Sequence, residues 1–512
     1  MSQVSTDRGI ASRGKMMNKT FKVEAPQPTS ALVSAPATDV QPSTSGDPGG
    51  EGSRLPGPLK DPHFQGLSGS SQFYLYYFGT ELSRSYVVYD DDSGNPFRYI
   101  VRLTPQCEAF RQIVIANAAM CAFRKSQASK MENRGPFLPV ASAQTAPDRR
   151  GLNLLHHPVT EPYQDALVAK QRAIQLLARA IEQGTLSTDT VFGCILLFIY
   201  LGFLNSDQNE LRIHLHAFRD ILQNPTLTTF AKAKATWIFR NGPSTDIILY
   251  DALQTAHFPS RASPTPLYTS LLPLLKTIVA DNHHFACPWE MLPAAVKIAD
   301  LTRAAAASSA PLGFVDEVRF TVGRIEALDI SKWAASLPAP GSGGSDSTSG
   351  GGGGGGGSSG GSSKGRSRLG SLETRMHIGE AHKSALLLFA ARLLPAGHCL
   401  PATTRSHLAR IMYHLRLVPA TDEGFKATSW PAFVVALESE EREEVAWALA
   451  HLVRVRRLVP WEYVWRAVEL VERTMQIRFT PEGVLAERHF VAMSRAILAE
   501  YPVIQHGWRF GV

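Results

Sequence analysis

The residue types that could hold zinc occur in two short clusters of this 512-residue sequence, HHFAC at 283–287 and GHC at 397–399. A structural zinc ion needs four nitrogen or sulfur ligands, which usually include close pairs such as C-x2-C or H-x3-H. The two cysteines nearest to each other in sequence are Cys107 and Cys121, and H-E-x-x-H is absent. We therefore expect no bound metal. The histidines of these clusters are expected to be exposed or hydrogen-bonded.

Other patterns typical of enzymes are equally incomplete. GSSGG at 357–361 matches the nucleophile pattern G-x-S-x-G, but it lies in a glycine tract with no strand before it and no helix after it. There is no G-x-x-x-x-G-K-[ST] phosphate loop. The acidic run ESEEREE at 438–444 is simply explained as the start of a helix, where carboxylates complement the positive end of the dipole. We predict no enzyme activity and no cofactor.

Positive charge is concentrated in one segment. The net charge is +7, and residues 364–416 contain only Glu373 and Glu380 as acids. The basic residues of this segment are Lys364, Arg366, Arg368, Arg375, Lys383, Arg392, Arg405, Arg410 and Arg416. Such a block is either a solvated basic face or a surface that attracts nucleic acid or acidic partners. KGRSR, with Lys364, Arg366 and Arg368, could also act as a nuclear import signal.

The cysteines and the most apolar segment indicate the cellular compartment of the chain. Five scattered cysteines and an N-terminus without an apolar signal core indicate reduced thiols inside the cell. Val191 to Leu204 are all apolar or glycine, but a bilayer crossing needs ~20 apolar residues. We expect a helix enclosed by other helices, and no membrane span.

Composition divides the chain into four parts. Residues 1–72 are rich in Ser, Pro and Gly and cannot bury enough apolar surface to order, so we expect a disordered tail. The Gly/Ser-rich stretch 341–370 is expected to be a disordered insertion. It separates 73–340 from 371–512, which we predict to be two parts of one helical domain.

Outside the tail and the insertion, the apolar residues follow helical periodicity. Residues 160–184 are predicted to form a helix with Thr160 as N-cap, Pro162 in the first turn and Gly184 as its stop. One face of this helix contains Tyr163, Leu167, Ile174, Leu177 and Ile181. A helix capped by Asp207 follows, and its apolar residues are Leu211, Leu215, Phe218 and Leu222.

The remaining segments follow the same pattern. Val445, Leu449, Leu452 and Val453 form one stripe, and after Pro460 a second stripe contains Val464, Trp465, Val468, Val471 and Met475. A further helix is predicted at 483–500, and FRYIVRL at 97–103 is the best strand candidate. The fold class is all-α: packed antiparallel helices in an array of helical hairpins. The tryptophans Trp430, Trp447, Trp461 and Trp465 are predicted to line the core or a pocket for a small apolar ligand.

Several motifs in fixed order resemble a known family. FYLYYFGTELSRSYVVYDDDSGNPFRYIV (73–101), CILLFIYLGFLNSDQNELRIHLHAFRDIL (194–222) and TSWPAFVVALESEEREEV (428–445) are similar to the fungal-specific transcription factor domain. The motif positions are Asn95, Pro96, Phe97, Arg98, His214, Trp430 and Pro431. The resemblance covers roughly 73–500.

The resemblance implies an all-α regulatory region in the nucleus. Its partners would be transcriptional coregulators, a homo- or heterodimer partner, or a small apolar ligand. Members of this family usually also carry a zinc-cluster DNA-binding module built from six cysteines, whereas residues 1–72 contain no cysteine. Either the gene product lacks this module or its predicted start misses an upstream exon that encodes it. We expect direct DNA binding by the chain as given to be weak. The alternative is a helical scaffold or adaptor with no role in transcription.

Overall fold

The apolar segment Val191–Leu204 is the core of a buried helix, α8 (Thr188–Asn205). Helices α5 (Glu108–Glu132), α7 (Pro162–Glu182), α9 (Gln208–Gln223) and α21 (Glu462–Arg478) contact it. Its side chains from Phe192 to Leu204 are almost all buried. Among the described helices, none is both long enough and apolar enough to cross a bilayer. The predicted enclosure of this segment is confirmed.

The computed structural model describes residues 64, 66–90, 95–132, 161–205, 208–223, 243–257, 265–279, 287–306, 313–337, 371–394 and 401–479. These residues form helices and no strand, so the all-α prediction is confirmed. Before α5, the chain forms α2 (Gly69–Tyr77), a π-helical turn η2 (Phe78–Leu82), α3 (Ser83–Ser85) and α4 (Pro96–Leu103). Because α2 begins at Gly69, helical structure starts slightly before the predicted boundary at 73.

The middle and last stretches are also helical. The middle contains α12 (Pro243–His257), α13 (Thr265–Val279), α14 (Met291–Ala306), α15 (Phe314–Glu326) and α16 (Ile330–Ser336). The last contains α17 (Leu372–Ala391), α18 (Pro401–Arg416), the 3-10 turn η3 (Glu423–Thr428), α19 (Ser429–Glu438) and α20 (Arg442–Leu458), followed by α21. The predicted tail before 64, the insertion at 341–370 and the helix at 483–500 lie outside the described residues.

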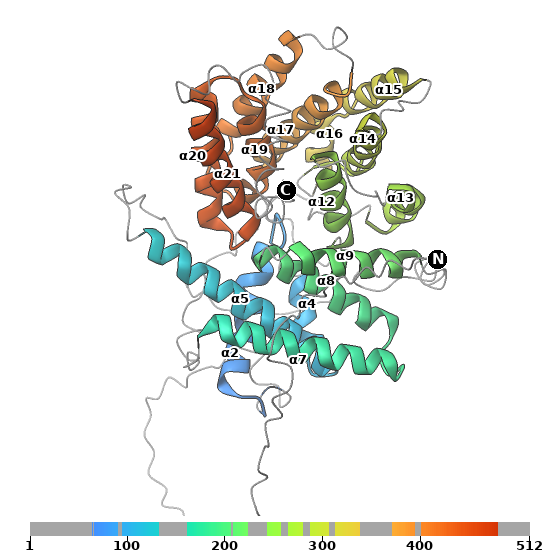
Figure 1. Ribbon diagram of the computed structural model, residues 1–512, viewed down its shortest axis with the longest axis vertical. Helices are drawn as coiled ribbons and strands as arrows, with labels where there is room; N and C mark the ends of the chain where they lie inside the picture. Colours follow the sequence, from blue (N-terminus) through green and yellow to red (C-terminus); the bar gives the residue numbers. More distant parts are fainter. Residues whose placement is uncertain are drawn as a thin grey trace, which may run out of the picture. The chain divides into compact units, whose positions relative to one another are not determined.

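Helix α17 is a second buried helix. Residues Ala381 to Ala391 are all buried, and α14, α15, α16, α18, α19 and η3 pack against α17 (Figure 1). Gly379 permits the close approach of α16, because an added Cβ would lie 2.7 Å from Ile330 Cγ2 and 3.1 Å from Trp333. One hydrophobic core contains residues from α8, α17 and the helices around them.

The predicted strand at 97–103 is wrong, because this segment is the helix α4. Asn95 is the N-cap, and its side chain accepts a hydrogen bond from the Phe97 backbone N–H at 2.9 Å. Pro96 occupies the first helical position, where its missing N–H costs nothing. The buried residues Phe97, Ile100 and Val101 follow helical spacing.

Helix α7 forms where predicted, but its N-cap and its buried face differ. The N-cap is Glu161, while Gly184 ends the helix with a φ of 62°. The buried face consists of Ala166, Ala169, Ala173 and Leu177. Of the predicted apolar face only Leu177 is buried, because α7 packs against its neighbour α5 through small side chains.

The other apolar stripes are in place. Leu211, Leu215, Phe218 and Leu222 of α9 are buried, as predicted. In α20, Val445 and Leu452 are buried, with Leu449 and Val453 at the edge of the core. In α21, Val464, Val468 and Val471 are buried, and Trp465 and Met475 are half-buried.

Candidate functional site

The sequence motif Asn95-Pro96-Phe97-Arg98 lies at a junction between two distant parts of the chain. The amide of Asn95 donates to the Ser83 carbonyl oxygen at 3.1 Å and to Asp90 Oδ1 at 2.8 Å. Arg98 forms an ion pair with Asp90 Oδ2. The motif therefore starts α4 and at the same time holds the segment before it.

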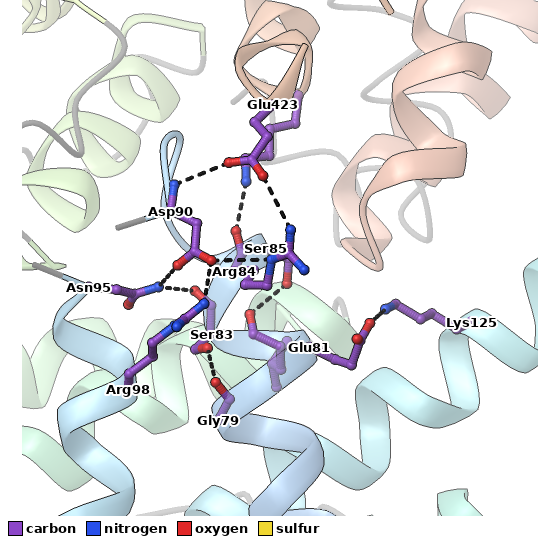
Figure 2. Close-up of polar contacts among 12 residues, drawn as sticks. Gly79, Glu81, Ser83, Arg84, Ser85, Asp90, Asn95, Arg98, Lys125 and Glu423 are labelled. Carbon is purple, nitrogen blue, oxygen red and sulfur yellow. Dashed lines mark hydrogen bonds and ion pairs between the residues drawn. The ribbon is translucent and has the colours of Figure 1, made fainter. Parts of the chain in front are cut away.

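Asp90 is the centre of this junction. Its side chain is only 2% exposed, and besides Asn95 and Arg98 it contacts Arg84 Nε at 3.2 Å. Figure 2 shows Asp90 between these three side chains. A buried carboxylate is stable only when it is paired and hydrogen-bonded, and Asp90 has two guanidinium groups and one amide. Its two oxygens are thus occupied by contacts with these three side chains.

The junction reaches η3 through Glu423 and Lys426. Glu423 Oε1 accepts from Arg84 at 3.2 Å, and Glu423 Oε2 accepts from the Asp90 backbone N–H at 3.3 Å (Figure 2). Lys426 Nζ donates to the Arg84 carbonyl oxygen at 2.7 Å. Burial lowers the pKa of Lys426 to about 8, although Glu423 and Asp90 act in the opposite direction. We call Arg84, Asp90, Asn95, Arg98, Glu423 and Lys426 the Asp90 junction.

Phe97 connects the motif to a buried aromatic cluster. Its ring centroid lies 4.8 Å from that of Tyr86 and 4.9 Å from that of Tyr200. The Tyr200 hydroxyl donates to Asp246 Oδ2 at 3.4 Å. Burial raises the pKa of Asp246 to about 8, although the hydrogen bond from Tyr200 acts in the opposite direction.

His214 has a structural role in the arrangement of α8, α9 and α7. Its ring stacks on Phe198 with centroids 4.7 Å apart, and its Nε2 lies 3.6 Å from Glu210 Oε1. Lys170 of α7 also pairs with Glu210. Burial would raise the pKa of Glu210, but His214 and Lys170 together lower it. The carboxylate thus joins α9 to α7.

Trp430 and Pro431 lie in the buried first turn of α19. The Trp430 ring packs against His382 and Phe389, with centroids 5.5 and 6.0 Å away. His382 Nε2 donates to the Ala427 carbonyl oxygen at 2.9 Å, and burial lowers the pKa of this histidine to about 4. The Trp430-Pro431 motif therefore also belongs to the packed core.

The chain has a curated relative that extends over most of its length. It is 25% identical over 429 residues to the acriflavine sensitivity control protein acr-2 of Neurospora crassa. The match covers 82% of this chain and 64% of acr-2, so the chain spans less than two thirds of that relative. No family model matches the sequence. No solved structure matches it either. The chain is thus similar to a fungal control protein.

The described part of the basic segment 364–416 is only partly a solvated face: Arg405, Arg410 and Arg416 are exposed, whereas two other basic residues are buried. Arg375 and Lys383 are buried, and Lys383 Nζ donates to the carbonyl oxygens of Glu326 and Leu328 at 2.9 and 2.7 Å. Three further arginines form ion pairs: Arg392 with Glu438, Arg405 with Glu441, and Arg410 with Glu380. Lys364, Arg366 and Arg368 lie outside the described residues.

The histidines and cysteines of HHFAC and GHC do not form a metal site within the residues that the structure describes. Cys287 is a buried free thiol, while His283, His284, His398 and Cys399 lie outside the described residues. In the described parts of the chain, no three His, Cys, Asp or Glu side chains are arranged to hold a metal ion. A pocket of about 400 Å³ lies along α7, and its described lining residues are Val168, Gln171, Arg172, Gln175, Leu176 and Arg179. It contains none of the predicted tryptophans.

Sequence reasoning identified Asn95 and Arg98 but missed Arg84, Asp90, Glu423 and Lys426. A local signal existed for Asp90, because YDDDSG places acids shortly before the Asn-Pro motif. Glu423 lies 333 positions from Asp90, and nothing in a single sequence connects the two.

Proposed function

We propose that this chain is a transcription-regulator-like protein of the nucleus, which acts through protein or small-ligand contacts of its helical region. The observation that carries the proposal is the similarity to acr-2 over 429 residues, which cover 82% of this chain. The ordered motifs that resemble the fungal-specific transcription factor domain support it. Since one fold serves many functions, the helical architecture alone supports it only weakly.

In this proposal the chain carries out no covalent chemistry. The best-organised polar group, the Asp90 junction, supports this view because its charged groups pair with one another. Direct DNA binding is proposed to be weak. The burial of Arg375 and Lys383 supports this part, because nucleic-acid affinity depends on cations that are available to phosphates.

The experiment is a comparison of transcripts and of location. A strain that lacks the gene should show altered transcript levels for a defined set of genes, and the full chain should restore them. The tagged full chain should accumulate in the nucleus. Unchanged transcripts together with a protein that stays outside the nucleus would contradict the proposal.

A helical adaptor without a transcriptional role is the second candidate. The exposed apolar side chains of α7 favour it, because such surfaces often bind other proteins. Affinity purification of the tagged full chain separates the two candidates. Chromatin or polymerase components would support the regulator, and exclusively non-nuclear partners would support the adaptor.

A further inference from the structure

Two exposed arginines lie over aromatic rings on the surface formed by α18, η3 and α20. Arg416 Cζ is 5.3 Å from the ring centroid of Trp447, and Arg454 Cζ is 5.0 Å from that of Phe425. Neither arginine forms an ion pair with any residue that the structure describes. The charges of these two guanidinium groups are therefore available to a partner.

The two rings belong to one continuous row of aromatic side chains. The ring centroid of Trp447 is 5.4 Å from that of His451, and the His451 centroid is 4.7 Å from that of Phe425. His451 Nε2 also contacts Thr428 Oγ1 at 2.7 Å. Burial and the neighbouring charge of Arg454 lower the pKa of His451 to about 3, so this ring adds no charge at neutral pH. The row is a packed support for the arginines, and they alone give it charge.

The sequence around these arginines contains no acid. Residues 401–421, which include α18, and residues 445–461, which form most of α20, have neither Asp nor Glu. The acids that flank these stretches are engaged elsewhere: Asp422 caps η3, Glu444 accepts from Ser439, and Glu462 pairs with Arg124. A carboxylate that approaches Arg416 or Arg454 would therefore be attracted and would meet no like charge from these two stretches.

Exposed apolar side chains accompany both arginines. Tyr413 of α18, three positions before Arg416, is 60% exposed, and Leu417, directly after Arg416, is 44% exposed. On α20, Leu458 is 48% exposed and lies four positions after Arg454, on the same helical face. Each cation thus has an apolar neighbour, a combination that suits a partner with both carboxylates and apolar side chains.

We propose that this surface binds an acidic amphipathic helix of a partner protein. We call it the arginine patch, and its residues are Tyr413, Arg416, Leu417, Trp447, Arg454 and Leu458. Carboxylates of the partner helix pair with the two guanidinium groups, whose planar shape suits two-point contact with a carboxylate. Apolar side chains of the partner cover the exposed tyrosine and leucines. From Trp447 to Leu458 the patch extends about 16 Å along α20, the length of three helical turns.

The inference rests on the proposed function, in which the chain acts through protein contacts, and it adds the chemistry of the partner. A nucleic acid fits the arginine patch less well. Its affinity rises with the number of phosphates that are neutralised, and two available arginines are few. A phosphate backbone also offers no apolar group to Leu417 and Leu458.

Fluorescence anisotropy with the purified full chain tests the proposal. The probe is a labelled synthetic peptide of ~16 residues, with Glu and Asp on one helical face and Leu and Phe on the adjoining face. A scrambled peptide of the same composition measures attraction by charge alone. The wild-type chain should bind the probe at least ~5-fold more tightly than the scrambled peptide, because only the probe presents its apolar side chains together.

Arg416→Glu combined with Arg454→Glu should weaken binding of the probe by ~10-fold or more, because two attractive contacts become repulsive. Arg319→Glu combined with Arg324→Glu is the matched control. It reverses two exposed arginines of α15, and Arg324 also lies over an aromatic ring, that of Phe320. This control should leave binding of the probe unchanged.

Tyr413→Ala tests the apolar part of the arginine patch without a change of charge. It should weaken binding of the probe several-fold and leave binding of the scrambled peptide unchanged. Circular dichroism checks that all variants keep wild-type helix content. A probe that binds no better than the scrambled peptide, or that binds the Arg416→Glu and Arg454→Glu chain as tightly as wild type, would overturn the proposal.

A labelled DNA duplex of arbitrary sequence is the second probe. The wild-type chain should bind it more weakly than the peptide at the same salt concentration. A duplex that binds more tightly than the peptide, and loses this affinity in the Arg416→Glu and Arg454→Glu chain, would also overturn the proposal and assign the patch to nucleic acid. These measurements leave transcript levels and nuclear location untouched, so failure of the patch is distinguishable from failure of the proposed function.

Discussion

Arg84 and Glu423 form an ion pair of 3.2 Å across 339 positions of sequence. The pair joins α3 to η3, and Lys426 strengthens the contact by donating to the Arg84 carbonyl oxygen. Because Arg84 also contacts Asp90, the start of the described chain and its last third are held by one polar network. This network contains the Asn-Pro-Phe-Arg motif, which explains why the motif is needed without assigning it a ligand.

The stability of the chain should depend on Asp90. Asp90→Asn removes the carboxylate charge that pairs with both Arg84 and Arg98, while Arg84 keeps its ion pair with Glu423. We expect a loss of about 2–3 kcal/mol in unfolding free energy, less than for a fully buried pair because both arginines are partly exposed. Urea denaturation of the full chain measures it. Glu317→Gln, which breaks the exposed pair with Lys297, is the control and should cost ~1 kcal/mol or less. Equal effects of the two substitutions would argue against the junction.

Two glycines in helices should respond to alanine in opposite ways. Gly379→Ala places a methyl group 2.7 Å from Ile330 Cγ2 and should destabilise the chain by about 1–3 kcal/mol. Gly323 of α15 is exposed and has no atom within 4 Å of an added Cβ. Gly323→Ala should therefore stabilise by ~0.5–1 kcal/mol, the difference in helix propensity. Thermal unfolding of both variants decides this, and a destabilising Gly323→Ala or a neutral Gly379→Ala would contradict the packing.

Acid should weaken the fold through buried histidines. Burial lowers the pKa of His382 to about 4, while an unfolded histidine titrates near ~6.5. Between these values the unfolded state binds more protons, so stability is full above pH ~6.5 and falls as the pH drops toward about 4. His382→Gln should make this fall shallower, by up to about 3 kcal/mol over the range. Denaturation curves at several pH values compare the slopes, and parallel slopes for wild type and variant would disprove the assignment.

Nuclear accumulation should depend on the predicted import signal. Replacing Lys364, Arg366 and Arg368 with Ala should reduce the nuclear fraction of the tagged full chain several-fold. Arg405→Ala combined with Arg410→Ala and Arg416→Ala is the control, because it also removes three positive charges, all from exposed arginines of the same basic segment. Fluorescence microscopy measures the nuclear fraction. If both sets of substitutions have the same effect, net charge is responsible rather than this short segment.

Much of the fold follows from local patterns. Leu211, Leu215, Phe218 and Leu222 of α9 are buried as their spacing predicts, and the apolar Val191–Leu204 is enclosed. The strand prediction for residues 97–103 is wrong because their aromatic and β-branched side chains are common in strands but also occur in helices. The N-cap Asn95 and the following Pro96 are the stronger signals, since they determine where a helix starts.

Other features depend on tertiary packing and cannot be read from one sequence. The apolar residues of α7 predict a buried face, yet the backbone of α5 approaches the alanines instead, since only small residues permit that distance. The basic segment looks like a charged surface. Two of its residues, Arg375 and Lys383, are nevertheless buried in the core. Their burial is possible because carbonyl groups distant in sequence, those of Ala334 and Glu326, accept their hydrogen bonds. Likewise, the Asp90 junction depends on residues of η3 that are remote in sequence.

A tethered reporter assay tests the central claim most directly. The full chain is fused to an unrelated DNA-binding module, and transcription of a reporter that carries the matching site is measured. The account predicts that the fusion raises or lowers reporter transcription several-fold relative to the module alone. A fusion that is present in the nucleus and bound at the site, yet leaves the reporter at the level of the module alone, would contradict the claim that this helical region regulates transcription.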